Sequence, residues 1–263
     1  MNTRIVAVAT ALLLLSGCTA APDEPEAVPT PTFEELAQPT EAARTPADAC
    51  VAPELGGTGM WIGADGAWFE TGVVGDGTTV AVFTHQANDG YCGFAKFAGV
   101  LDGLGIRSVL LNLCGFGQTV CGLEDGFVTS GADAVLAAAQ WARDNGATRV
   151  ISVGASAGGA TAILAAELDG DNGLLDGVVD LSGPLVYGGT DTQPLIADLT
   201  IPILFVVSGD DPVVSPTDMD ELGEASSSES WSRIAGSGHG WAQLFAQGQL
   251  IPPGQAVVDF IVG

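Results

Sequence analysis

From residue 50 onward, short runs of β-branched and other apolar residues alternate with longer, Ala-rich segments. The apolar runs predict strands at 78–84, 108–113, 149–153, 177–181, 203–207 and 231–234. The segments with helical spacing predict helices at 94–104, 131–145, 157–168 and 254–261. Apolar strands that alternate with helices are typical of a parallel sheet covered on both faces. We therefore predict a single α/β domain over residues 50–263.

The N-terminus has the pattern of an export signal. Arg4 precedes an apolar run at 5–15 that is too short to span a membrane, which takes roughly 20 apolar residues. Cys18 directly follows Leu15-Ser16-Gly17, which resembles a bacterial lipobox. The alternative is an ordinary signal peptide with an incidental Cys. The lipobox predicts that residues 1–17 are removed and that Cys18 is lipidated, anchoring an exported protein in the outer leaflet of the bacterial cell membrane.

Residues 18–49 differ in composition from the rest of the chain. They contain six prolines and many acidic residues, with few large apolar side chains. Such a segment buries too little surface to fold, and its prolines keep it extended. We expect it to be a disordered tether between the lipid and the domain.

The charge of the chain excludes two classes of partner. Its 263 residues carry 32 Asp and Glu against 7 Lys and Arg, a formal net charge of −25. A chain this acidic neither neutralises nucleic-acid phosphates nor docks electrostatically on anionic lipid. The hydrophobic fraction of 47% excludes disorder of the whole chain. The acidity is an adaptation to salt or a compositional drift, and the composition does not choose between these.

Four cysteines besides Cys18 are candidates for disulfides: Cys50, Cys92, Cys114 and Cys121. Disulfides persist outside the cytoplasm, and four thiols allow three pairings. The Cys114–Cys121 loop is the easiest to close, and Cys50–Cys92 would then tether the start of the domain. With two histidines and no C-x-x-C pair, we expect no metal site and no cofactor.

The clearest chemical motif is Gly154-Ala155-Ser156-Ala157-Gly158, between a predicted strand and a predicted helix. A Ser on a tight strand–turn–helix junction needs small neighbours, which is the G-x-S-x-G nucleophile elbow. The helix that follows directs its N-terminal N–H groups at the site, where they favour developing negative charge. The alternative is a Gly-rich turn with a solvated Ser.

A nucleophilic Ser requires a base, and the base requires an orienting group. Asp210 and Asp211 follow the strand at 203–207, and His239 lies in a Gly-rich loop after the strand at 231–234. The chain order Ser, Asp, His is the order of one known catalytic fold.

With these motifs the chain resembles the α/β-hydrolase family over nearly all of 50–263. The resemblance implies Ser156 as nucleophile, His239 as general base and acid, and an Asp after the 203–207 strand as orienter. Asp211-Pro212-Val213-Val214 matches the family's Asp-Pro-x-Val, which favours Asp211 over Asp210.

The same resemblance implies an oxyanion hole of two backbone N–H groups, those of Ala157 and Gln86. Where the family often has His-Gly, this chain has His85-Gln86, so the backbone donor is kept. His85 is then expected to be a structural loop residue.

Only about twenty residues, 182–202, separate the strands between which the family inserts its lid. We expect a loop with at most one short helix there, and an open site suited to small or accessible esters. The predicted function is a lidless serine carboxylesterase. Alternatives are a peptidase, a lactonase or a polyester or lipid hydrolase on the same triad, and a non-catalytic ligand-binding lipoprotein. No G-x-G-x-x-G follows a strand into a helix, so dinucleotide binding is disfavoured.

Overall fold

The computed structural model describes residues 50, 55–122, 126–226 and 232–263. The predicted signal peptide, the lipidation candidate Cys18 and the predicted tether lie outside the described residues. The fold below is therefore that of the predicted α/β domain.

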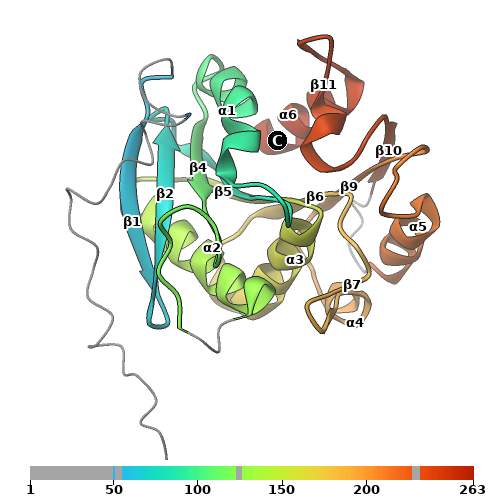
Figure 1. Cartoon of the computed structure of the whole chain (residues 1–263), viewed down its shortest axis with the longest axis horizontal. Helices are drawn as coiled ribbons and strands as arrows, with labels where there is room; N and C mark the ends of the chain where they lie inside the picture. Colours follow the sequence, from blue (N-terminus) through green and yellow to red (C-terminus); the bar gives the residue numbers. More distant parts are fainter. Residues whose placement is uncertain (1–49, 51–54, 123–125, 227–231) are drawn as a thin grey trace, which may run out of the picture. The chain divides into compact units, whose positions relative to one another are not determined.

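The described residues form an eight-stranded sheet in the order β1-β2-β4-β3-β5-β6-β9-β10 (Figure 1). β1 pairs antiparallel with β2, and β2 antiparallel with β4, whereas all neighbours from β4 to β10 are parallel. The strands are β1 Thr58–Ala64, β2 Ala67–Val74, β3 Thr79–Thr84, β4 Arg107–Leu111, β5 Arg149–Ala155, β6 Gly177–Leu181, β9 Ile203–Ser208 and β10 Ser232–Gly236. The mostly parallel sheet confirms the predicted α/β class.

Both faces of the sheet are buried because side chains of the parallel strands alternate between two cores. In β3, Val80 and Val82 join one core, whereas Ala81 and Phe83 join the other. The first core is closed by α2 Phe127–Asp144, α3 Ala157–Asp169 and α5 Pro216–Ala225, and the second by α1 Ala95–Asp102 and α6 Pro252–Val262. Burial on both sides explains why these strands have continuous apolar sequences.

The predicted elements are present, with small differences at their ends. β4 ends at Leu111 and not at residue 113, and α2 begins at Phe127, four residues before its predicted start. The first turn of α2 contains Thr129 and Ser130, which have the composition of a loop. The Ser130 hydroxyl donates to the carbonyl of Gly126 at 2.6 Å, so the polar side chain is satisfied within the helix.

The β1–β2 hairpin was not among the predicted strands, because glycines and a Glu interrupt its apolar runs. Its turn residues Asp65 and Gly66 both have positive φ, 41° and 84°. A two-residue turn with positive φ at both residues has a twist that matches the twist of the two strands it joins. The Asp-Gly pair between apolar flanks is the signal in the sequence that identifies it.

The segment between β6 and β9 contains a small hairpin, β7 Val186–Tyr187 with β8 Thr190–Asp191, and the short helix α4 Gln193–Ala197. No lid domain is present in residues 182–202, all of which are described. The remaining short elements are η4 Tyr91–Phe94, η5 Gly170–Asn172, η6 Gly240–Leu244, β11 Phe245–Ala246 and β12 Gln249–Leu250. Within the described residues, no helix combines the length and apolar character that crossing a membrane requires.

Two disulfides are present, Cys50–Cys92 and Cys114–Cys121. They are the pairing that loop closure favours, out of the three that four cysteines allow. The first joins the start of the domain to η4, and the second closes the loop after β4.

The two disulfides are expected to differ in their contribution to stability. They span sequence separations of 42 and 7 residues. Closing the longer loop removes more entropy from the unfolded chain, so replacing both cysteines of Cys50–Cys92 with Ser should lower the free energy of unfolding by about 4 kcal/mol. The same change at Cys114–Cys121 should cost about 2.5 kcal/mol. Urea unfolding of the two double variants measures both values, and a larger loss at the short loop would contradict the entropic explanation.

Candidate active site

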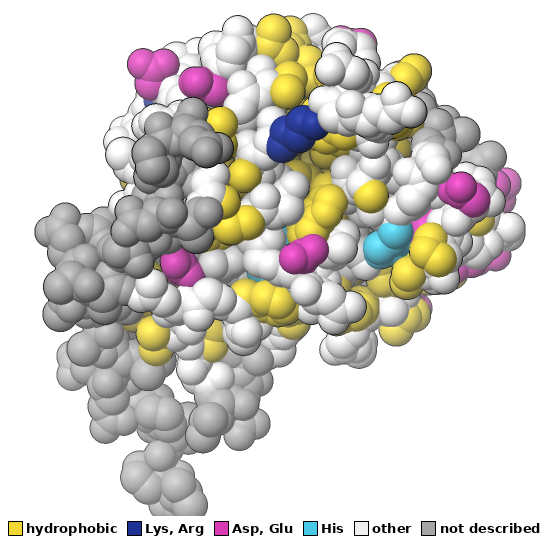
Figure 2. Space-filling view, turned by 45° about the horizontal axis from the view of Figure 1, so that its top comes forward, with side chains coloured by type: hydrophobic (Ala, Val, Ile, Leu, Met, Phe, Trp, Pro, Cys, Tyr) yellow, Lys and Arg dark blue, Asp and Glu magenta, His cyan; other side chains and the backbone are white. Residues whose placement is uncertain are grey.

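The predicted site residues all follow parallel strands, at the carboxyl edge of the sheet. Gln86 follows β3, Ser156 follows β5, Asp211 follows β9 and His239 follows β10. In a sheet of this kind, loops at the carboxyl ends of the strands form the ligand-binding crevice. Figure 2 shows that hydrophobic side chains and a His side chain are exposed on the same face of the domain.

Ser156 lies on a sharp turn between β5 and α3. Its backbone angles are φ 52° and ψ −120°, a strained conformation for a residue other than Gly. The turn is held because the N–H of Ser156 donates to the carbonyl of Leu181 at 2.8 Å. Its own carbonyl accepts from the N–H of Gly159 at 2.7 Å. This is the geometry expected of a nucleophile elbow.

The two glycines of the motif are required by close packing. A Cβ on Gly154 would lie 2.0 Å from the carbonyl oxygen of Gly158. A Cβ on Gly158 would lie 2.3 Å from the carbonyl oxygen of Thr84, at the end of β3. Any larger residue at either position would displace the turn. The small residues of the motif therefore follow from the packing of this turn.

His239 and Asp211 are in direct contact. Nδ1 of His239 is 3.0 Å from each carboxylate oxygen of Asp211. The Asp211 side chain has no exposed surface, and that of His239 is 17% exposed. Because Nδ1 is occupied by the carboxylate, Nε2 is the ring nitrogen that remains for proton transfer.

The surroundings of Asp211 favour its charged form. Burial raises its pKa, but hydrogen bonds from the Val214 N–H, the Ser182 hydroxyl, the Val213 N–H and His239 outweigh burial. The pKa of Asp211 therefore lies below its ordinary value. Its Oδ1 accepts from the N–H groups of Val213 at 2.8 Å and Val214 at 2.9 Å, which fix the carboxylate.

Asp210 contacts the loop of His239 and not its ring. Its carboxylate accepts from the N–H of Gly238 at 3.2 Å and from the hydroxyl of Ser237 at 3.3 Å. The hydrogen bonds from Gly238 and Ser208 are the main causes that lower the pKa of this exposed group. Asp210 thus contacts the backbone and Ser237 of the loop, whereas Asp211 contacts the imidazole itself.

The loop of His239 packs against the turn of Ser156. Gly240 has φ 55°, and a Cβ on it would lie 3.4 Å from Cβ of Ala155 and 2.4 Å from Oε1 of Gln86. The residue after His239 therefore meets both the residue before Ser156 and the predicted oxyanion residue Gln86. The structure brings all four predicted positions into one region.

Trp241 fixes the same loop from its other side. A Cβ on Gly93 would lie 2.3 Å from the Trp241 ring, and the ring packs edge-on against Phe94 at 5.3 Å. Both contacts are in η4, which also carries Cys92 of the first disulfide. The His239 loop thus rests on a covalently braced segment.

The two predicted oxyanion donors lie next to the elbow. Ala157 is the first residue of α3, where backbone N–H groups have no partner within the helix. The β3 end is tied to this turn because the Thr84 hydroxyl donates to the carbonyl of Gly158 at 2.9 Å. The carbonyl oxygen of His85 would lie 2.8 Å from a Cβ on Gly158, so the backbone that leads to Gln86 runs along the elbow.

His85 has the environment of a structural residue. Its Nδ1 donates to the carbonyl of Gln86 at 2.8 Å, and its Nε2 accepts from the N–H of Leu113 at 3.0 Å. The ring is buried against Phe116 and Phe127. Burial lowers the pKa of His85 to about 4, against the smaller opposite effect of its hydrogen bond to Gln86. With both nitrogens occupied, the neutral ring is not available as a base.

Two polar residues beside the elbow escaped the sequence analysis, Asp180 and Ser182. Asp180 is buried in β6, its Oδ1 accepts from the N–H of Gly183 at 2.7 Å, and a Cβ on Gly159 would lie 2.1 Å from that oxygen. Burial raises the pKa of Asp180 to about 7, although the Gly183 hydrogen bond lowers it. The signal that could have found this residue is a carboxyl group inside the apolar run at 177–181.

The raised pKa of Asp180 predicts a pH-dependent effect of Asp180→Asn on stability. In the folded state the pKa of this carboxyl is about 7, whereas the ordinary pKa of an Asp side chain is 3.8. Stability of the wild type should thus fall as pH rises through this window, whereas the Asn variant lacks the titrating group. From pH 5 to pH 8 the stability of Asp180→Asn relative to wild type should increase by about 3 kcal/mol. Urea unfolding at the two pH values tests this, and a constant difference would contradict it.

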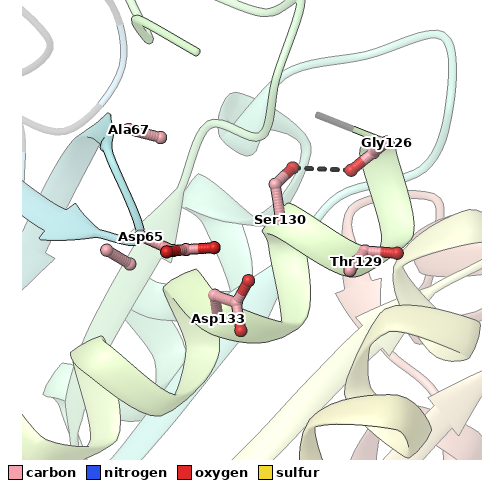
Figure 3. A pocket seen from close by; sticks show the side chains of 7 residues that line it. Asp65, Ala67, Gly126, Thr129, Ser130 and Asp133 are labelled. Carbon is pink, nitrogen blue, oxygen red and sulfur yellow. Dashed lines mark hydrogen bonds between the residues drawn. The ribbon is translucent and has the colours of Figure 1, made fainter. Parts of the chain in front are cut away.

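A separate small pocket lies between the β1–β2 turn and the start of α2 (Figure 3). Its volume is about 150 Å³, and it is lined by Ala64, Asp65, Ala67, Gly126, Thr129, Ser130 and Asp133. None of the predicted site residues lines it. In the described part of the chain, no group of three or more His, Cys, Asp or Glu is arranged to hold a metal ion.

Comparison with known proteins identifies the fold through structure and not through sequence. No family model matches the chain, and no curated protein matches its sequence. An esterase of Pyrococcus furiosus superposes with a TM-score of 0.64 at 11% identity, covering 90% of this chain and 95% of the esterase. Est1E of Butyrivibrio proteoclasticus with bound ferulic acid gives 0.61 at 14% identity, covering 77% and 96%.

A monoacylglycerol lipase of Paleococcus ferrophilus gives a TM-score of 0.59 at 16% identity, covering 74% of this chain and 98% of the lipase. At these identities the likeness establishes the fold. The chain has the α/β-hydrolase fold, as the resemblance predicted.

Proposed function

We propose that the protein is a serine hydrolase that cleaves carboxylic esters through Ser156, His239 and Asp211. The observation that carries the proposal is the Asp211–His239 hydrogen bond, on a loop that packs against the strained turn of Ser156. A buried carboxylate, an imidazole and a Ser on a nucleophile elbow are the parts that acyl transfer requires. The esterase and lipase names of structural neighbours support the same reaction class.

In the first half of the reaction, the Ser156 hydroxyl oxygen attacks the ester carbonyl while Nε2 of His239 takes its proton. Asp211 holds the ring by Nδ1 and stabilises the imidazolium that forms. The carbonyl oxygen becomes an oxyanion, for which the N–H groups of Ala157 and Gln86 are the donors. The N-terminus of α3 adds a favourable dipole.

In the second half, the C–O bond to the alcohol breaks and the alcohol leaves with the proton from His239. Water then gives a proton to Nε2 and attacks the acyl group on Ser156. His239 then returns this proton to the Ser156 oxygen as the bond between that oxygen and the acyl carbon breaks, so the acid is released and the Ser156 hydroxyl is restored. The protein's own residues therefore complete the cycle, and no step calls for a cofactor.

The short segment between β6 and β9 favours small or accessible esters. Residues 182–202 provide only the β7–β8 hairpin and the five-residue helix α4. A long acyl chain needs an enclosing apolar pocket, which an inserted lid domain would supply. We therefore expect higher kcat/KM for short acyl chains than for long ones.

A fluorophosphonate probe followed by peptide mass spectrometry tests the proposal. The probe should label Ser156 in the wild type and leave Ser156→Ala unlabelled. A series of p-nitrophenyl esters of increasing acyl length then measures the substrate preference. Ser152→Ala serves as a control, because Ser152 is buried in β5 away from the elbow.

Absence of labelling at Ser156 together with absence of ester turnover would favour a non-catalytic ligand-binding protein. Labelling with turnover of amides or lactones but not of esters would keep the triad and change the substrate class. Turnover that rises with acyl length would overturn the preference for short chains.

We also propose that the protein is exported and anchored by lipid on Cys18. The lipobox-like residues before Cys18 and the two disulfides of the domain support export. In a bacterial host, wild-type protein should partition with membranes, and Cys18→Ser should be released or remain as uncleaved precursor. Wild-type protein found wholly in the medium would contradict the anchor.

A further inference from the structure

Ser182 lies directly after β6 and forms hydrogen bonds with β9, Gly240 and Gln243. Ser182 has no exposed surface, and its φ of 58° is an unusual backbone angle for a residue with a side chain. Its N–H donates to the carbonyl of Val206 in β9 at 2.8 Å. The backbone is thus anchored to the strand that leads to Asp211.

Two donors occupy the lone pairs of the Ser182 hydroxyl. The N–H of Gly240, the residue after His239, donates to it at 3.3 Å. The side-chain amide nitrogen of Gln243 donates to it as well. The orientation of this amide follows from its other contacts, the carbonyls of Val206 at 3.5 Å and Gly240 at 3.3 Å, since carbonyl oxygens require a donor.

A hydroxyl group has one proton and two lone pairs. With both lone pairs occupied, Ser182 still has its proton to donate, and its hydroxyl interacts with the carboxylate of Asp211 in the direction that favours the charged form. The hydrogen bond from the Ser182 hydroxyl is one of those that lower the pKa of Asp211. One side chain therefore connects the carboxylate and the loop of the imidazole that it orients.

We infer that Ser182 is a positioning residue for the catalytic pair, which holds the Asp211 carboxylate and the His239 loop in register through a single hydroxyl group. The inference rests on the proposed function. Ser182 touches neither the reacting atoms nor the substrate in this arrangement. It acts through Asp211 and His239.

Removing the hydroxyl should affect kcat and leave KM nearly unchanged. Asp211 loses one hydrogen bond to its charged form, and the loop loses the acceptor for Gly240. A hydrogen bond to a charged group contributes about 1.5–3 kcal/mol, which corresponds to a loss of about 10- to 160-fold in kcat. The pKa of Asp211 should rise, so the carboxylate accepts a proton at higher pH. The acidic limb of the kcat profile, which belongs to the Asp211–His239 pair, should therefore move to higher pH.

The experiment compares Ser182→Gly and Ser182→Ala with wild type. Gly accommodates the positive φ, whereas Ala keeps Cβ, and both remove the hydroxyl. If the hydroxyl is responsible, the two variants lose kcat to a similar extent and share the shift of the acidic limb. Ser152→Ala is the matched control, because Ser152 is equally buried and its hydroxyl has no hydrogen-bond partner among the described residues.

Two successive measurements distinguish a failure of this inference from a failure of the proposed function. Wild-type turnover that is lost in Ser156→Ala establishes the serine hydrolase first. Given that result, a Ser182→Gly variant within twofold of wild type in kcat, with an unmoved acidic limb, overturns the inference alone. A loss confined to Ser182→Ala would also overturn it, since Ser182→Gly lacks the same hydroxyl. If Ser182→Gly does not fold, Ser182→Ala decides by its acidic limb, which backbone strain alone would not move.

Discussion

Ser156→Ala should lower kcat on a short acyl ester by about 10⁴-fold or more, because it removes the hydroxyl group of the residue on the strained turn between β5 and α3. His239→Ala should have an effect of similar size, since no other group then accepts the proton of Ser156. The double variant should be scarcely slower than either single one, because a triad acts as a unit. Steady-state kinetics on purified variants measure these values.

His85→Ala is the matched control for His239→Ala. His85 has both ring nitrogens in hydrogen bonds to the backbone, so its loss should disturb the loop after β3 and reduce kcat far less than the loss of His239. Full turnover by Ser156→Ala would show that the hydrolase proposal is wrong. A His85→Ala variant as inactive as His239→Ala would challenge the choice of base.

Asp211→Asn should reduce kcat by about 10⁴-fold through a change of tautomer. Oδ1 of Asp211 accepts from the N–H groups of Val213 and Val214, so an Asn would place its amide oxygen there. Its NH2 group would then face Nδ1 of His239 and require that nitrogen to be an acceptor. The proton of the neutral ring would move to Nε2, which could no longer accept the proton of Ser156. A pH profile and kcat on a short ester test the variant.

Asp210→Asn is the control at the neighbouring position and should retain most of the activity. An Asn keeps an oxygen that can accept from the N–H of Gly238, and this carboxylate does not contact the imidazole. The opposite pattern, an active Asp211→Asn and a crippled Asp210→Asn, would place the orienting carboxylate one residue earlier.

Much of the fold could be predicted from sequence because the central strands are buried on both faces and therefore carry continuous apolar runs. The β1–β2 hairpin could not be recognised in this way, because an antiparallel edge allows Gly and Glu inside the strands. Its signal is the Asp65-Gly66 turn, which depends on backbone angles and not on hydrophobicity.

The candidate site residues could be proposed from sequence because each lies in a short motif after a strand. Ser182 had no such signal, since its role depends on Gly240 and Gln243, 58 and 61 residues away along the chain. The preference for Asp211 over Asp210 did have a sequence signal, the match to Asp-Pro-x-Val, and the structure adds the contacts: Asp211 accepts from the N–H of Val213, whereas Asp210 accepts from the N–H of Gly238.

β10 is the last strand of the sheet and pairs with β9 alone among the described strands. Edge elements open in local fluctuations more readily than the centre of a sheet, and such openings do not require global unfolding. His239 follows this edge strand, whereas Ser156 follows the central strand β5. Heating should therefore separate His239 from Ser156 before the bulk of the sheet melts. Amide hydrogen exchange at β10 and loss of turnover should then share one transition that precedes the loss of circular dichroism.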